Sequence, residues 1–234
     1  MSQISDRLRS VFFDLDGTLA DSAPDLAYAL NRLLKEEKQQ TLPYEKIRVR
    51  VSHGSNALIH LAFGISERDP AFEDLRQRFL EKYHSHLANE TRLFPGMETT
   101  LQWLEANDMN WGVITNKPAW LTDPLMDKLG LKGRAACIVS GDSVANRKPH
   151  PESLLHACEL SGSKPSQCVY VGDAPRDIKA GRRAGMRTLV ALFGYIDPED
   201  DPFTWGADGV IETPLDLIDW IDSGHKAREF SASR

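Results

Sequence analysis

Two carboxylates stand close together in residues 11–22, VFFDLDGTLADS, where an apolar run ends. Asp14 and Asp16 close the run, and Gly17 and Thr18 follow at once. Such a run is typical of a strand buried on both faces, and two like charges at its end repel one another. A divalent cation would remove that cost, because Mg2+ accepts one or two carboxylates together with waters and a phosphate oxygen. The spacing therefore indicates a metal-assisted site at the end of a strand.

Three further segments carry polar groups at equivalent places. A second apolar run ends in Thr115-Asn116-Lys117, a loop carries Arg147-Lys148-Pro149, and a third run ends in GDAPRD at residues 172–177. In an open α/β sheet, ligands bind at the carboxyl ends of the strands. The sequence thus predicts an acidic cluster, a hydroxyl and an ammonium group gathered at one edge of a sheet.

That combination suits phosphoryl transfer. Asp14 and Asp173 offer hard oxygen ligands for Mg2+, and a carboxylate is able to attack phosphorus to give an aspartyl phosphate. A second acid two residues further on, Asp16, is able to protonate the leaving oxygen and later to deprotonate water. Thr115 and Lys148 are suited to hold the phosphoryl oxygens on which charge develops.

The predicted elements that position these groups form an α/β protein. Short β-branched or aromatic runs predict strands at residues 11–14, 111–115, 136–139, 169–172, 188–192 and 209–211. Helical patterns lie between them at about 97–107, 118–129, 151–161, 174–184 and 214–222. Alternation of strand and helix indicates a doubly wound parallel sheet of Rossmann-like architecture.

The stretch between the first and second strands differs, because it contains helical patterns and no convincing strand. One apolar stripe joins Leu26, Leu30 and Leu34, and another joins Leu75, Phe79, Tyr83 and Leu87 at helical spacing. We expect residues 20–91 to form an inserted helical cap. Residues 1–19 and 92–234 then form the catalytic core.

Composition limits the classes of partner and compartment. The chain has 234 residues and a net charge of −6, which argues against nucleic-acid binding. Three cysteines at scattered positions favour buried thiols over disulfides. The start, MSQISDRLRS, lacks the apolar region of a signal peptide, and no run approaches the ~20 apolar residues of a membrane span. We expect a cytoplasmic monomer or homodimer that acts on a small-molecule phosphate ester, away from membranes.

The ordered motifs DLDGT, VITN, KP and GDxxxD resemble those of the haloacid dehalogenase superfamily, over essentially the whole chain. The resemblance implies a Mg2+-dependent phosphatase with a small α-helical cap. It implies that Asp14 is the nucleophile, that Asp16 is the general acid/base with its backbone carbonyl on Mg2+, and that Asp173 binds the metal. It further assigns phosphate binding to Thr115, Asn116 and Lys148, and support of the metal and of Lys148 to Asp177. Ala174 stands where Ser or Thr is common in the superfamily, a departure with a modest expected effect.

Other functions share parts of this pattern. A phospho-accepting signalling domain also uses acids, a Thr and a Lys on an α/β sheet, but it lacks a cap and a second acid. Dehalogenases of the superfamily lack the second carboxylate, Asp16. A phosphomutase with the same cap would have an identical set of core residues, so that alternative stays open.

Substrate selection is expected to depend on the cap, and above all on residues 47–59, IRVRVSHGSNALI. Arg48 or Arg50 is a candidate to pair with a substrate carboxylate. The candidates to offer backbone N–H groups at a helix N-terminus are Ser52, His53, Gly54 and Ser55.

Two groups of the superfamily provide the substrate hypotheses. The chain is similar overall to phosphoglycolate phosphatases, including TNKP at 115–118, and residues 194–208, GYIDPEDDPFTWGAD, look more like bacterial phosphatases of N-acetylmuramic acid 6-phosphate. The resemblance favours that sugar phosphate, from cell-wall recycling, over 2-phosphoglycolate.

Overall fold

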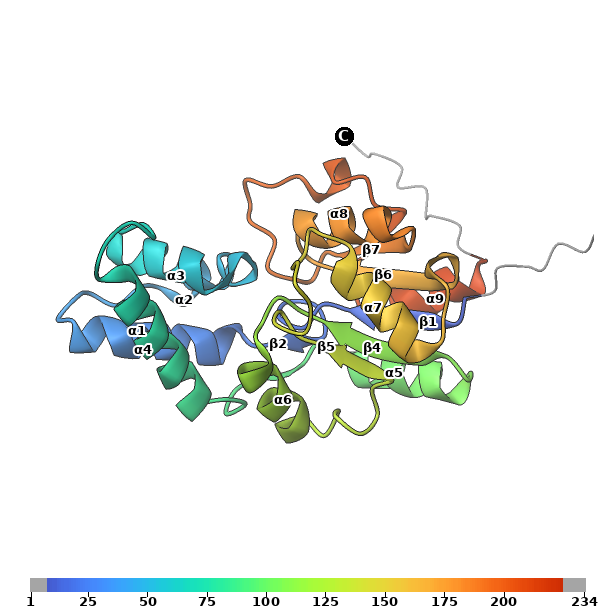
Figure 1. Cartoon of the computed structure of the whole chain (residues 1–234), viewed down its shortest axis with the longest axis horizontal. Coiled ribbons are helices and arrows are strands. Elements are labelled where there is room, and N and C mark those ends of the chain that lie inside the picture. The colour runs from blue at the N-terminus through green and yellow to red at the C-terminus, as the bar shows by residue number, and fades with distance from the viewer. Residues whose placement is uncertain (1–7, 225–234) are drawn as a thin grey trace, which may run out of the picture.

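A six-stranded parallel sheet forms the centre of the larger lobe of the computed structural model, which describes residues 8–224 (Figure 1). The strand order is β5-β4-β1-β6-β7-β8. Each of the six strands predicted from the sequence is present to within one residue at either end. Their bounds are β1 (Ser10–Phe13), β4 (Asn110–Ile114), β5 (Cys137–Val139), β6 (Cys168–Gly172), β7 (Arg187–Ala191) and β8 (Gly209–Ile211).

The strand order determines where the functional residues meet. From β1 the chain goes to β4 and β5 on one side of the sheet, and it then returns to β6 on the other side of β1. The neighbours β1 and β6 therefore flank the topological switch point, where doubly wound sheets bind their ligands. Asp14 directly follows β1 and Asp173 directly follows β6.

Helices cover both faces of the sheet, and successive strand residues point to opposite layers. Val11 and Phe13 belong to one buried cluster with residues of α5, α6 and α9, whereas Phe12 belongs to a second cluster with residues of α7 and α8. This alternation is the two-residue period of a strand that is buried on both sides. The bounds of these helices are α5 (Met97–Ala106), α6 (Ala119–Lys128), α7 (Glu152–Ser161), α8 (Pro175–Ala184) and α9 (Asp216–Asp222).

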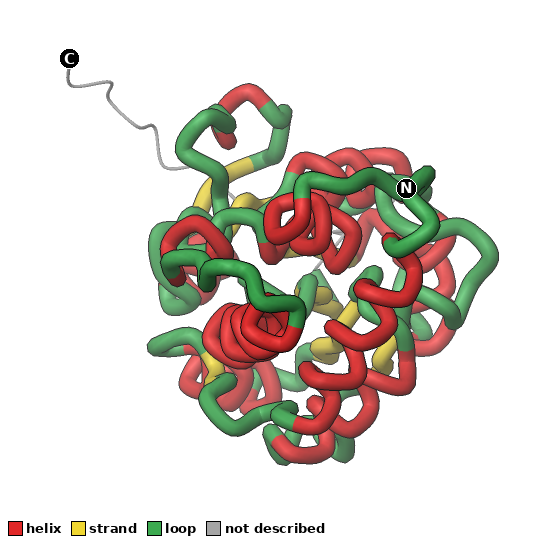
Figure 2. The backbone as a smooth tube through the Cα atoms, turned by 90° about the vertical axis from the view of Figure 1, so that its left-hand side faces the viewer, coloured by secondary structure: helices red, strands yellow, loops and turns green. Residues whose placement is uncertain are grey.

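The remaining α-helices of the described chain form the smaller lobe (Figure 1). Figure 2 views the molecule from the side of this lobe, with its helices in front of the strands. The two predicted apolar stripes are buried there, on α1 and along α4 and the residues just after it. We refer to this lobe as the cap, and the limits 20–91 for it and 1–19 with 92–234 for the core stay a prediction. Its helices are α1 (Ala23–Glu36), α2 (Tyr44–Arg48), α3 (Gly54–Phe63) and α4 (Phe72–Ser85).

One feature of the cap differs from the sequence-based expectation. Two short strands, β2 (Ala20–Asp21) and β3 (Arg92–Leu93), pair antiparallel at the base of the cap. The sequence showed no strand here because two-residue strands are too short to display a period of two. Their pairing joins the two chain connections between cap and core.

Within residues 8–224, none of the helices has both the length and the apolar character needed to cross a bilayer. The expectation that no signal peptide is present concerns residues 1–10, and residues 1–7 lie outside the described part of the chain.

Candidate active site

Asp14 lies buried at the floor of the site, where β1 ends. Its backbone N–H donates to Val171 O of β6, which extends the ladder by one residue. Its Oδ1 accepts from the Leu15 N–H at 2.8 Å and lies 3.0 Å from Lys148 Nζ. The carboxylate is held in place on one oxygen, while its Oδ2 is 3.7 Å from Arg176 Nη2.

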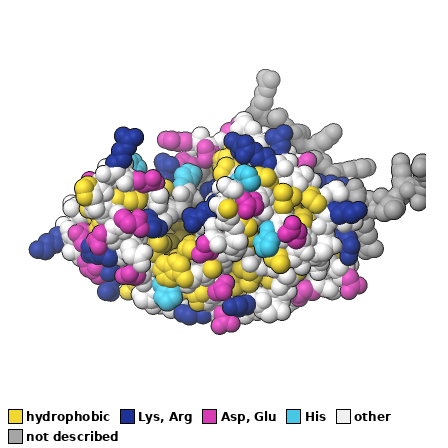
Figure 3. Space-filling view, in the orientation of Figure 1, with side chains coloured by type: hydrophobic (Ala, Val, Ile, Leu, Met, Phe, Trp, Pro, Cys, Tyr) yellow, Lys and Arg dark blue, Asp and Glu magenta, His cyan; other side chains and the backbone are white. Residues whose placement is uncertain are grey.

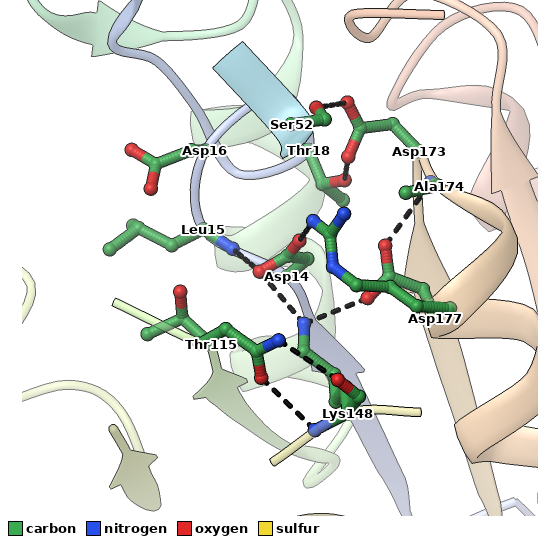
Figure 4. Close-up of polar contacts among 12 residues, drawn as sticks. Asp14, Leu15, Asp16, Thr18, Ser52, Thr115, Lys148, Asp173, Ala174 and Asp177 are labelled. Atoms are coloured by element: carbon green, nitrogen blue, oxygen red, sulfur yellow. Dashed lines mark hydrogen bonds and ion pairs between the residues drawn. The ribbon is translucent and has the colours of Figure 1, made fainter. Parts of the chain in front are cut away.

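Lys148 is the buried cation of the site, with a side chain that is 0% exposed. Besides Asp14, its Nζ contacts Asp177 Oδ1 at 2.8 Å, Ile114 O at 2.9 Å and Tyr170 Oη at 2.7 Å. A buried ammonium group is tolerated only with such full pairing. Figure 4 shows Asp14, Lys148 and Asp177 converging from separate segments of the chain.

The Asn116 side chain has a supporting position. It bonds the Lys148 backbone twice, from Nδ2 to Lys148 O and from the Lys148 N–H to Oδ1, both at 3.0 Å. These bonds hold the lysine loop against the Thr115 loop. Thr115 itself is buried and lines the cavity above Asp14.

Three buried carboxylates, those of Asp14, Asp173 and Asp177, have oxygens within 4.8 Å of one another. Burial raises the pKa of Asp173, and the Asp14 and Asp177 charges raise it further. Burial and the Asp14 charge also raise the pKa of Asp177, although Lys148 opposes the change. Hard oxygen donors that repel one another fit a divalent cation, which would offset the repulsion.

Asp173 is oriented by groups from three different segments. Its Oδ1 accepts from Thr18 Oγ1 at 3.3 Å, and its Oδ2 accepts from Ser52 Oγ at 2.6 Å and from the Tyr195 N–H at 2.9 Å. Gly17 lies against the same carboxylate with φ +87°, and a Cβ there would be 2.1 Å from Asp173 Oδ2. The glycine after the two acids is therefore required both for its backbone conformation and for space.

Asp16 points away from the buried trio (Figure 4). Its side chain is 18% exposed, and its Oδ1 accepts from Ser22 Oγ and from Lys117 Nζ, the latter at 2.8 Å. Burial opposes the charge of Lys117, but Asp16 nevertheless raises its pKa. Burial also raises the pKa of Tyr83, the second partner of Lys117, to about 12, so the phenol stays neutral.

A cavity of about 450 Å3 lies between core and cap, with Asp14, Asp16 and Thr115 among its lining residues. Figure 3 shows this face hollowed between the two lobes, with Lys and Arg side chains beside the hollow. The cap contributes to the lining the predicted segment Ser52, His53, Gly54 and Ser55, at the start of α3.

Arg48 and Arg50, the predicted partners of a substrate carboxylate, are not among the residues that line the cavity. Arg48 Nη2 donates to Phe193 O at 3.3 Å, and its guanidinium lies over the Tyr195 ring. Arg50 Nη1 forms an ion pair with Asp197 Oδ2 at 2.9 Å. In this arrangement both arginines join the cap to the loop after β7.

Several residues that line the cavity had been given no functional role from the sequence. Arg76, Arg147 and Arg176 line the cavity where Arg48 and Arg50 do not, and Trp120 and Lys117 line it from the segment that follows Thr115. Lys117 directly follows Thr115-Asn116, Trp120 stands three residues beyond Lys117, and Arg176 lies within GDAPRD. Position within a recognised motif was therefore a signal that could have identified two of them, Lys117 and Arg176.

A buried carboxylate trio, a buried ammonium group and a cavity hydroxyl, all at the switch point of a parallel sheet, form the kind of site that a phosphoryl-transfer enzyme requires. Comparison with known proteins supports the same class of enzyme. The sequence model of the family of haloacid dehalogenase-like hydrolases matches residues 11–191.

Curated relatives match nearly full length. An N-acetylmuramic acid 6-phosphate phosphatase of Pseudomonas putida is 43% identical over 93% of this chain and 97% of its own. A phosphoglycolate phosphatase of Xanthomonas campestris is 44% identical over 89% of this chain and 94% of its own. The crystal structure of a predicted phosphoglycolate phosphatase from Haemophilus somnus superposes with a TM-score of 0.82 at 26% identity, covering 92% of this chain and 98% of that one.

The chain belongs to the haloacid dehalogenase-like hydrolase family, and within it the chain is a phosphomonoester hydrolase. The signalling-domain alternative is therefore set aside.

Proposed function

We propose that the protein is a Mg2+-dependent phosphatase that acts through an aspartyl phosphate at Asp14 on a carboxylate-bearing sugar phosphate, with N-acetylmuramic acid 6-phosphate as the leading candidate. The observation that carries the proposal is the placement of the Asp14 carboxylate. It is fixed through Oδ1 by Leu15 and Lys148, and it lies at the floor of a cavity that also contains Asp16 and Thr115.

In the first step, a carboxylate oxygen of Asp14 attacks phosphorus and the ester P–O bond breaks. The electron pair leaves with the alcohol oxygen, which takes a proton from the Asp16 carboxyl group. Lys148 and the Thr115 hydroxyl stabilise the phosphoryl oxygens, because both groups are already positioned before charge develops. The alcohol then departs and the phosphoryl group remains on Asp14.

In the second step, water attacks phosphorus and gives its proton to the Asp16 carboxylate, while the P–O bond to Asp14 breaks. The products are inorganic phosphate and the original Asp14 carboxylate, so the sum of the two steps is hydrolysis of the ester.

Asp14 and Asp173 would hold the metal, with Asp177 beside them and the Asp16 carbonyl as the further ligand that the resemblance implies. When bound, Mg2+ supplies positive charge that screens the carboxylates from the incoming phosphate.

Cavity size favours the larger of the two candidate substrates. A volume of about 450 Å3 lies in the range of roughly 300–1,000 Å3 typical of sites that enclose drug-sized ligands. N-acetylmuramic acid 6-phosphate has more than twice as many heavy atoms as 2-phosphoglycolate. A two-carbon acid would leave most of the cavity to water.

The chemistry of the lining points the same way. Trp120 lines the cavity with a side chain that remains 42% exposed, so its ring offers an apolar face for the CH groups of a sugar. Arg147 Nε donates to Gly141 O, and its Nη groups form no ion pair with any residue between 8 and 224. We assign the substrate carboxylate to Arg147, in place of Arg48 or Arg50.

Free, buried cysteines and the acidic composition accord with a cytoplasmic enzyme for small soluble esters. Oligomeric state enters none of these steps, and both a monomer and a homodimer fit the proposal.

A panel of phosphate esters, ranked by kcat/KM, tests the substrate assignment. We expect N-acetylmuramic acid 6-phosphate to rank first, with the corresponding sugar phosphate that lacks the lactyl carboxylate well behind it. If 2-phosphoglycolate ranks first, the substrate assignment is wrong and the smaller ester takes its place. Stoichiometric isomerisation of a sugar phosphate without release of phosphate would indicate the phosphomutase alternative.

Trp120→Ala should raise KM for N-acetylmuramic acid 6-phosphate about three- to tenfold, because an aromatic contact contributes roughly 0.5–1.5 kcal/mol. The KM for 2-phosphoglycolate should change little, since that ester has no sugar ring to pack against the indole. Phe203→Ala removes an aromatic side chain outside the cavity lining and serves as the matched control. Equal changes in KM for both esters would rule out ring stacking at Trp120.

A further inference from the structure

Asp16, the proposed general acid/base, depends on partners outside its own loop. Its Oδ1 accepts two hydrogen bonds, one from Ser22 Oγ at the residue before α1 and one from Lys117 Nζ at 2.8 Å. Its Oδ2 accepts no hydrogen bond from any residue that the structure describes. One oxygen of this cavity-lining residue is thus held, while the other remains available.

Lys117 is in turn held by the cap. Its Nζ donates to Tyr83 Oη at 2.9 Å and lies 4.5 Å from the centre of the Tyr83 ring. Tyr83 is fully buried on α4, and the Lys117 side chain is only 6% exposed. The Lys117 backbone N–H bonds Thr115 Oγ1 at 3.1 Å, which ties the same residue to the phosphate-binding loop.

We infer that Lys117 and Tyr83 are positioning residues that couple docking of the cap to the orientation of Asp16. This inference rests on the proposed function, because it requires Asp16 to be the proton donor to the leaving oxygen. When α4 is docked, Tyr83 fixes Lys117, and Lys117 fixes Asp16 Oδ1. When α4 moves away, Lys117 loses its second acceptor and Asp16 loses a defined orientation. Proton transfer to the leaving group is therefore confined to the state in which the cavity is closed.

A comparison of leaving groups separates this role from a structural one. The parameter kcat/KM includes only the steps up to departure of the alcohol, and departure of an alkoxide needs a proton from Asp16. Departure of p-nitrophenolate does not need that proton, because the phenolate is stable in water. A defect in the position of Asp16 should therefore appear with the alkyl ester and be absent with p-nitrophenyl phosphate.

The experiment measures kcat/KM for Lys117→Met and Tyr83→Phe with N-acetylmuramic acid 6-phosphate, or with 2-phosphoglycolate if that is the better substrate, and with p-nitrophenyl phosphate. Lys117→Met should lower the value for the alkyl ester roughly 30- to 100-fold, part of the ~100- to 10,000-fold that general acid catalysis contributes. Tyr83→Phe should lower it roughly three- to tenfold, as expected for the loss of one hydrogen bond. The kcat/KM for p-nitrophenyl phosphate should fall less than about threefold in both variants. Such retained activity would also show that both variants fold.

Lys128→Met is the matched control. Lys128 lies on α6 and also crosses from core to cap, where its Nζ donates to Leu87 O at 2.8 Å, but it has no contact with Asp16. We expect no selective loss in this variant. Equal losses for both esters in Lys117→Met, or a selective loss in Lys128→Met as well, would overturn the inference while leaving the proposed function intact. Failure of the unmodified protein to hydrolyse either ester would overturn the proposed function, and the inference would fall with it.

Discussion

Asp14→Asn should abolish turnover, with a fall in kcat of at least about 1,000-fold for every ester. The amide retains the shape of the side chain but is a poor nucleophile, so no aspartyl phosphate forms. The fold should persist, because the Leu15 N–H and Lys148 Nζ are able to donate to the amide oxygen as they do to Oδ1. Initial rates and thermal unfolding, measured on the same preparation, test both parts of this expectation.

A covalent readout makes the test specific for the nucleophile. Acid quenching of the unmodified protein with labelled substrate should trap a phosphoenzyme, and Asp14→Asn should trap none. Asp123→Asn serves as the control, because Asp123 is exposed and its ion-pair contact is with Lys132 on the surface. Turnover near the unmodified level in Asp14→Asn would refute the assignment of the nucleophile.

Removal of divalent metal has the second large effect. EDTA should lower activity by about 100-fold or more, and added Mg2+ should restore it, because electrostatic stabilisation at a phosphoryl centre is worth several kcal/mol. Without the cation, the carboxylates of Asp14, Asp173 and Asp177 repel both one another and the phosphate. Initial rates measured across an Mg2+ titration give the apparent affinity.

A binding measurement without turnover complements these rates. Mg2+ should raise the melting temperature of the unmodified protein with a concentration dependence set by its affinity. The shift should be much smaller for Asp173→Asn, which removes one charge from the trio. Full activity in EDTA, or an unchanged Mg2+ response in Asp173→Asn, would remove the proposed metal role of Asp173.

The sequence was sufficient for the sheet and the family, and it named carboxylates and a lysine that lie together in the structure, while their catalytic roles stay a prediction. Continuous apolar runs predict buried parallel strands, because a strand that is covered on both faces needs apolar side chains at successive positions. That pattern is visible in a few neighbouring residues. Parallel strands of one sheet also end at the same edge, so Asp14, Thr115 and Asp173 could be brought together from strand ends alone. The order of the motifs that contain these residues is the feature that resembles the haloacid dehalogenase superfamily.

The sequence did not determine how the cap meets the core. Arg48 and Arg50 had the chemistry to bind a carboxylate, yet they contact the loop after β7, and Arg147 and Trp120 line the cavity in their place. From the sequence, Lys117 was a loop residue with no assigned role. The structure places Tyr83 of α4 within hydrogen-bond distance of its Nζ.

The reason is that a charged side chain pairs with whichever partner the docked surfaces bring within about 3 Å, and that partner is often far away in sequence. Local patterns determine which elements form, because strands and helices depend on neighbouring residues. Whether a given Lys or Arg side chain faces the substrate, another loop or Asp16 depends on how the two lobes pack. Only the tertiary structure decides this packing.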